Sequence, residues 1–216
     1  IFTQELDTLN PLYTNMWFST ITHQIWNCWA WDFDDKAAPR PVLVTEMPST
    51  ENGGISPDGK VITLTLRDDL VWSDGEPLTS ADFLFTYEMT LDPANAVAST
   101  FPYDVLTSLE APDPQTVVMT FPEPYAAWVG TMWRGLIPEH VLRPVFEDAG
   151  TIDAGGERTG EHPFAMRALL EREHARYRGA AAGGRDQAGH LRRRGLQGAS
   201  GGPGRTAGPG PFATGP

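Results

Sequence analysis

Residues 66–87 read Leu-Arg-Asp-Asp-Leu-Val-Trp-Ser-Asp-Gly-Glu-Pro-Leu-Thr-Ser-Ala-Asp-Phe-Leu-Phe-Thr-Tyr and carry more structural information than any other stretch of the chain. The alternation of apolar and polar residues over 61–66 predicts a strand that ends where this stretch begins. Ser73-Asp74-Gly75 predicts a tight turn, because glycine accepts a positive φ angle and aspartate can bond its own backbone.

The second half of the stretch predicts a capped helix. Thr79 stands three residues before Asp82, which is the spacing of a capping box. Apolar residues follow at helical spacing until Asp92-Pro93 ends the run; these are Phe83, Leu84, Tyr87 and Leu91.

The same stretch closely resembles the signature of the extracellular solute-binding proteins of peptide and nickel ABC importers, the family-5 oligopeptide- and dipeptide-binding type. The residues that match this landmark in order are Asp58-Gly59-Lys60, Leu66-Arg67-Asp68-Asp69, Trp72-Ser73-Asp74-Gly75, Pro77, Thr79, Ala81-Asp82 and Phe85-Thr86-Tyr87. Leu6 to Tyr13 is similar to the family's first strand exit, and Ile137 to Leu142 is similar to its return into the first lobe. The likeness covers about residues 1–153.

The resemblance implies an α/β chain with part of a periplasmic-binding-protein type II fold. Residues 1–39 would begin the first lobe, 40–135 would form the small inserted α/β domain of the peptide-binding subclass, and 136–153 would return to the first lobe. Ligand would be captured between two lobes and delivered to a membrane permease.

Residues 154–216 form a low-complexity Gly/Ala/Arg/Pro tail for which we expect disorder, since such a composition buries too little apolar surface. From 157 onward there is no Val, Ile, Trp, Asn or Lys, and this part holds ten of the 16 Lys and Arg but five of the 28 Asp and Glu. These residues have GC-rich codons, so a frameshifted reading of a GC-rich gene is our interpretation. The resemblance also implies that the second lobe of the family is missing here, so we expect a truncated chain with at most weak activity.

Composition and motifs argue against an enzyme and against a cofactor or metal. The five His are scattered without metal-ligand spacing, and no nucleophile elbow, phosphate loop or dinucleotide fingerprint occurs. Asp32 and Asp34 begin like a calcium loop, but Ala37 and Leu43 stand where Gly and Glu are required. The single Cys28 excludes an internal disulfide and is expected to be a small core residue.

Partners and location follow from charge and from the resemblance. The acidic first part argues against nucleic acid, although the basic tail could grip phosphates without specificity. There is no long apolar run and no signal segment in this chain. The resemblance implies a monomer that is periplasmic or extracellular and attached to the cell surface, with a peptide or other small solute and an importer permease as partners.

The candidate ligand-binding residues lie in segments that the resemblance places against the ligand. Asn15 could hydrogen-bond a peptide backbone, and Met16 and Trp17 offer adaptable apolar surface. The full set is Tyr13, Asn15, Met16, Trp17, Phe18, Phe101, Tyr103 and Trp133. The alternative interpretation is an acidic carbohydrate- or protein-interaction module with a disordered basic tail, which would also explain the many aromatic residues.

Overall fold

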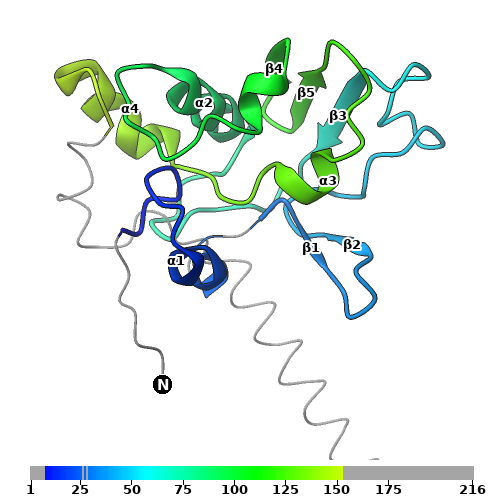
Figure 1. The fold of residues 1–216 in the computed structure, drawn as a ribbon, viewed down its shortest axis with the longest axis horizontal. Coiled ribbons are helices and arrows are strands. Elements are labelled where there is room, and N and C mark those ends of the chain that lie inside the picture. Colours follow the sequence, from blue (N-terminus) through cyan, green and yellow to red (C-terminus); the bar gives the residue numbers. More distant parts are fainter. Residues whose placement is uncertain (1–7, 26, 28, 153–216) are drawn as a thin grey trace, which may run out of the picture. The chain divides into compact units, whose positions relative to one another are not determined.

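The computed structural model describes residues 8–25, 27 and 29–152 (Figure 1). The three-residue strands β1 (Trp31–Phe33) and β2 (Pro39–Pro41) pair as an antiparallel hairpin. A second antiparallel sheet contains β3 (Val61–Thr65), β5 (Thr116–Thr120) and β4 (Ser108–Asp113), in the spatial order β3-β5-β4. The helical elements are α1 (Trp17–Thr22), η1 (His23–Ile25), α2 (Ser80–Leu91), η2 (Tyr103–Val105), α3 (Trp128–Thr131) and α4 (Glu139–Ala149).

The three-stranded sheet confirms the alternation in the sequence. Ile62, Leu64 and Leu66 are buried, as the alternation predicts. Their cross-strand neighbours in the central strand β5 are fully buried too: Met119 pairs with Ile62, and Val117 pairs with Leu64. Pro112-Asp113-Pro114 is turn chemistry in the sequence, but the turn after β4 is shorter, because Asp113 still pairs with Thr116. The strand register shifts between Glu110 and Asp113, which accommodates Pro112 because a proline has no N–H for the ladder.

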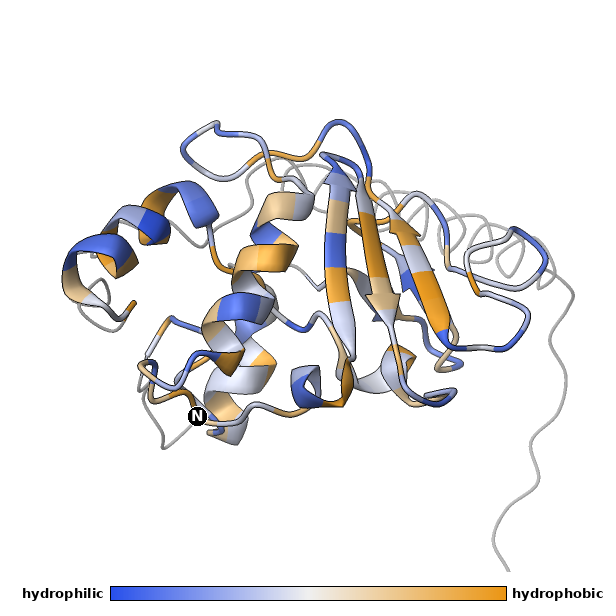
Figure 2. Ribbon diagram, turned by 90° about the horizontal axis from the view of Figure 1, so that it is seen from above, coloured by the Kyte–Doolittle hydropathy of each residue, from blue (hydrophilic) through white to orange (hydrophobic). Residues whose placement is uncertain are grey.

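Helix α2 begins with the predicted capping box. Thr79 accepts a hydrogen bond from the backbone of the first turn, and the Asp82 carboxylate accepts one from the Thr79 N–H at 2.8 Å. The preceding turn is also as predicted, with Gly75 at a φ angle of 97° and the Asp74 carboxylate accepting from the Glu76 N–H. Figure 2 shows α2 running alongside the sheet next to β4, with α4 on the other side of the helix.

The apolar interior forms two clusters, and α2 contributes to both. The sheet cluster covers the three-stranded sheet and includes Leu43, Ile62, Leu64, Trp72, Phe83, Val117, Met119 and Trp133. The loop cluster consists of Leu12, Phe85, Met89, Ile137, Leu142 and Ile152. A helix that packs on two sides shows no single apolar stripe. The helical spacing in the sequence therefore predicted that Phe83 is buried, but it did not predict that Phe85 and Met89 are buried as well.

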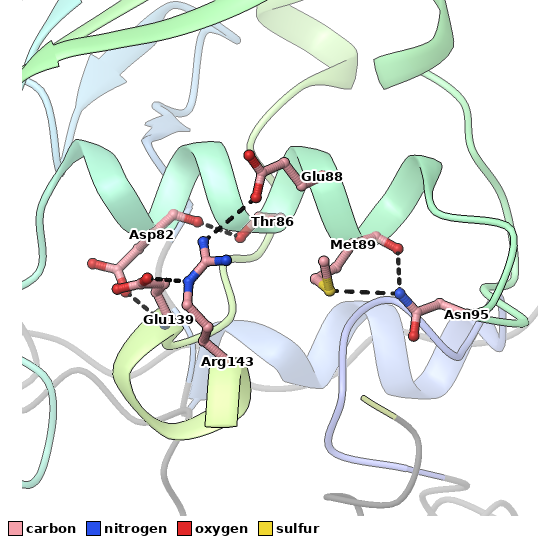
Figure 3. Close-up of polar contacts among 7 residues, drawn as sticks. All are labelled: Asp82, Thr86, Glu88, Met89, Asn95, Glu139 and Arg143. Atoms are coloured by element: carbon pink, nitrogen blue, oxygen red, sulfur yellow. Dashed lines mark hydrogen bonds and ion pairs between the residues drawn. The ribbon is translucent and has the colours of Figure 1, made fainter. Parts of the chain in front are cut away.

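Asp82 joins the beginnings of α2 and α4 (Figure 3). One carboxylate oxygen accepts from Thr79, and the other accepts from the Glu139 N–H at 2.9 Å. Burial raises the pKa of Asp82, while the bonds from Thr79 and Glu139 and the nearby Trp72 indole act in the opposite direction. Arg143 bonds Glu139 within α4 and forms an exposed ion pair with Glu88 of α2 at 3.4 Å, which adds little to the stability of the α2–α4 contact.

Two predicted helices are shorter than expected. In the sequence, Phe18, Ile21, Ile25, Cys28 and Trp29 stand at helical spacing, which predicts one helix. In the structure, α1 ends at Thr22 and a single 3₁₀ turn follows; Cys28 lies outside the described residues. Tyr125, Trp128, Val129 and Met132 also stand at helical spacing and predict a helix, but the structure has only α3 there, and Tyr125 before it stacks on Phe121 with ring centroids 5.6 Å apart. The predicted tail also lies outside the described residues, and the predicted domain boundaries stay predictions.

Candidate functional site

A pocket of about 300 Å³ opens where several loops meet beside the C-terminal end of α2. It lies among three segments, residues 11–15, 98–103 up to the start of η2, and 130–135 from the end of α3, with Thr20 and His23 from α1 and η1 and Thr90 from α2. Its volume is at the lower end of the range for small-molecule sites. The pocket is therefore the candidate ligand site of the described residues.

The first two loops are joined edge to edge by hydrogen bonds. The Ala98 N–H donates to the Leu12 carbonyl at 2.8 Å, and the Asn15 amide donates to the Ala98 carbonyl at 3.1 Å. The buried Asn10 carboxamide oxygen accepts from the Leu12 N–H at 3.0 Å and so fixes the bend that leads into this loop. Asn15 thus positions the wall of the pocket through its side chain.

Buried asparagines also hold the segments behind the pocket. Asn95 donates to the Met89 carbonyl at the end of α2, and its oxygen accepts from the Ile152 N–H at 2.9 Å; its bond to Met89 is drawn in Figure 3. Asn27 is fully buried, donates to the Leu136 carbonyl at 2.7 Å and accepts from the Leu136 N–H at 3.3 Å. These amides satisfy backbone groups that no helix or strand pairs.

Gly135 allows the third loop to approach the first. A Cβ atom at this position would lie 2.8 Å from the Pro11 Cβ, which is closer than two carbon atoms can pack. The absence of a side chain at 135 therefore sets the distance between these two walls of the pocket.

Trp133 and Tyr103 anchor the third and second of these segments in the sheet cluster. Trp133 has a φ angle of 57°, unusual for a bulky residue, and its ring is fully buried between Phe83 at 4.8 Å and Tyr103 at 5.1 Å. Its indole N–H points to the Met119 sulfur at 3.2 Å. Burial raises the pKa of the Tyr103 phenol, so Tyr103 is a neutral residue at any physiological pH.

The pocket brings together some of the predicted site residues. Asn15, Phe101 and Tyr103 line it, and Phe101 remains 53 % exposed. Tyr13, Met16, Trp17 and Phe18 do not line it; Trp17 is 67 % exposed on α1, and Trp133 belongs to the sheet cluster. Whether these residues contact a ligand stays a prediction.

Arg134 is a lining residue that the sequence reasoning missed. It is exposed, its guanidinium donates to the Gly130 carbonyl, and it lies over the Trp29 ring at 5.1 Å from the centroid. The sequence signal that could have found it is the small number of basic residues: residues 1–156 hold few Arg or Lys, and this Arg stands between Trp133 and Gly135. His23, Thr14 and Thr131 were missed as well, and nothing in their sequence context distinguishes them.

The described part of the chain contains no group of three or more His, Cys, Asp or Glu that could hold a metal ion. Within the same residues, no helix has both the length and the apolar character needed to cross a membrane.

Comparison with protein families gives a match over residues 38–166 to the model described as "Bacterial extracellular solute-binding proteins, family 5 Middle". Protein XP55 of Streptomyces lividans is 32% identical over 127 residues, which is 59% of this chain and 22% of that protein. Oligopeptide-binding protein OppA of Bacillus subtilis is 48% identical over 40 residues, 18% of this chain and 7% of that protein. The chain thus spans about a fifth of the length of Protein XP55.

Solved structures show the same fold. NikZ of Campylobacter jejuni in complex with Ni(L-His) matches with a TM-score of 0.56 and 26% identity, over 65% of this chain and 27% of that one. The ABC transporter substrate-binding protein CtaP of Listeria monocytogenes matches with a TM-score of 0.56 and 25% identity, over 70% of this chain and 29% of that one. The described residues therefore have part of the type II periplasmic-binding fold, as the sequence predicted.

Proposed function

Since the chain belongs to the bacterial extracellular solute-binding proteins of family 5, a family of transport proteins and not of enzymes, we propose that it captures a small solute, in the first place a peptide, for an ABC importer. The pocket beside α2 supplies one side of the capture site. The location that goes with this function is periplasmic or extracellular, at the cell surface, and the partner after capture is a membrane permease.

The observation that carries the proposal is the pocket itself, within a chain of this family. Its walls combine exposed aromatic surface at Phe101 with polar side chains such as Asn15 and Thr131, a composition suited to a ligand with a polar backbone and apolar side groups. A relative, OppA of Bacillus subtilis, is named as oligopeptide-binding, and a pentapeptide is bound in the oligopeptide-binding protein of Thermus thermophilus, which shares the fold.

Affinity for peptide is expected to be weak. Tight small-molecule sites enclose about 70–90% of their ligand, whereas this pocket of about 300 Å³ opens among loops. We therefore expect binding by the full 216-residue chain in the range of about 1 mM.

Titration of the ¹⁵N-labelled full chain with the tripeptide Ala-Phe-Ala tests the function. Amide resonances of the pocket loops, such as those of Ser99 and Gly130, should shift, and those of β5 should not. Ser99→Phe places a ring at the pocket and should weaken binding, whereas Ala96→Phe changes an exposed residue of the same loop that does not line the pocket. Shifts spread evenly over the chain, or equal binding by both variants, would contradict the proposal, and a low-micromolar Kd would contradict the expected weakness.

A further inference from the structure

We infer that the pocket recognises the carboxylate group of its solute and that Arg134 is the residue that binds it. The inference rests on the proposed function for the existence of a captured solute, and it adds the chemical class of the group that the described wall selects.

Charge distribution is the first observation. Residues 1–156 carry six Lys and Arg against 23 Asp and Glu, so an anionic ligand is repelled by most of this surface. Among the pocket-lining residues, however, there is no Asp or Glu, and Arg134 is the charged one. The pocket is therefore a locally cationic place on an acidic domain.

The pairing of the other cations is the second observation. Four of the six basic residues bind carboxylates within the domain, in the pairs Arg40–Asp32 at 3.5 Å, Lys60–Glu123 at 3.2 Å, Arg67–Asp69 at 2.9 Å and Arg143–Glu88 at 3.4 Å. Arg134 has no carboxylate within ion-pair distance among the residues that the structure describes. Lys36 shares this property but stands in the exposed turn of the β1–β2 hairpin, away from the pocket lining.

The orientation of Arg134 is the third observation. The bond to the Gly130 carbonyl and the contact with the Trp29 ring hold the guanidinium in place. An arginine whose position is fixed loses less conformational entropy on binding, and its planar fork can donate two parallel hydrogen bonds to one carboxylate. Phe101 lies exposed among the same lining residues and can contact the apolar part of the solute.

The test compares a free carboxylate with its neutral counterpart on the full chain. Ala-Phe-Ala and its C-terminal amide are titrated separately, and glutarate serves as a carboxylate probe without a peptide backbone. The resonances followed are the backbone amides of the 98–103 and 130–135 loops and the Arg134 side-chain Nε–H. We expect the free tripeptide to bind about tenfold more tightly than the amide, which corresponds to about 1.4 kcal/mol.

The variants separate Arg134 from general charge effects. Arg134→Gln should abolish the difference between tripeptide and amide, and Arg134→Lys should retain part of it, because the charge remains but the fork is lost. Arg40→Gln removes one exposed cation from β2 and should leave the difference unchanged. Unshifted β5 resonances in Arg134→Gln show that the variant is folded.

Each outcome distinguishes this inference from the proposed function. If tripeptide and amide bind the pocket equally and Arg134→Gln changes nothing, the carboxylate inference is overturned and solute capture stands. If the tripeptide does not bind but glutarate shifts the Arg134 resonance, the carboxylate inference is supported and peptide capture fails. If neither carboxylate probe binds, the inference is overturned.

Discussion

The sheet region, made of β3, β5, β4 and α2, and the loop region around the pocket satisfy their backbone groups in different ways. In the sheet region, five consecutive residue pairs join β3 to β5, and apolar side chains such as Leu64 and Val117 fill the interior. In the loop region, the buried side chains of Asn27 and Asn95 bond backbone groups of distant segments, and that of Asn10 fixes the bend of its own loop. The first region depends on repeated, interchangeable contacts, whereas the second depends on single side chains that have no substitute.

Asn27→Ala should have the largest effect of the changes that test this contrast. It leaves both the N–H and the carbonyl of Leu136 buried without their partner, and we expect a loss of about 2–4 kcal/mol in the free energy of unfolding. Native-state hydrogen exchange should show faster exchange at the Leu136 amide than at the β5 amides.

Asn52→Ala is the control, because the Asn52 side chain makes three hydrogen bonds, one more than that of Asn27, in an exposed turn where water can replace them. Chemical denaturation should give a cost of under about 1.5 kcal/mol. Equal costs for the two variants would show that burial does not separate the two asparagines.

Gly135→Ala should have the next largest effect. The added methyl group would lie 2.8 Å from Pro11, so the first and third loops must separate, at a cost of about 1–3 kcal/mol. Gly130→Ala is the control within the same pocket, since its Cβ would meet nothing within 4 Å and alanine favours the helix α3. Thermal unfolding measures the two variants. If Gly130→Ala lowered the melting temperature more than Gly135→Ala, the close approach of Gly135 to Pro11 would be contradicted.

The smallest expected effect concerns the pH dependence of two aspartates in residues 66–87. Partial burial alone would raise the pKa of Asp74, but the hydrogen bond with His140 at 2.8 Å and the bond from Glu76 hold it below its usual value of about 3.9. Stability from Asp74 is therefore present above that pH and is lost as the pH falls through the lowered pKa. Asp82 has the opposite sign: its raised pKa means that its protonation stabilises the fold, and this contribution is lost as the pH rises through the folded-state pKa.

The test is to measure the free energy of unfolding across the acidic range for the native chain, for Asp74→Asn and for Asp82→Asn. The change of the difference between native chain and variant with pH is the slope that belongs to each aspartate. Relative to Asp82→Asn, the native chain should gain stability as the pH falls; relative to Asp74→Asn, it should lose a few tenths of a kcal/mol below about pH 3.9. Two slopes of the same sign would contradict the assigned environments.

The sequence predicts the sheet region better than the loop region for a physical reason. The alternation around Ile62 and Leu64 and the capping pair of Thr79 and Asp82 are local patterns, and the structure confirms them. The second role of Asp82, at Glu139, joins residues that are 57 positions apart, and the Asn27–Leu136 contact spans 109. No spacing rule marks such contacts, so the pocket that they shape, with Arg134 in its lining, could not be predicted from local pattern.

The contact between Asn27 and Leu136 also bears on the order of events during synthesis. A chain emerging at about 5–20 residues per second exposes the Asn27 segment for about 5–20 s before Leu136, 109 positions later, is available. During that interval β3, α2, β4 and β5 can already associate, because their mutual contacts lie within residues 61–120. The pocket is thus completed last, when the 130–135 segment reaches the 11–15 and 98–103 segments, and a factor that binds nascent chains can meet the Asn27 segment throughout that interval.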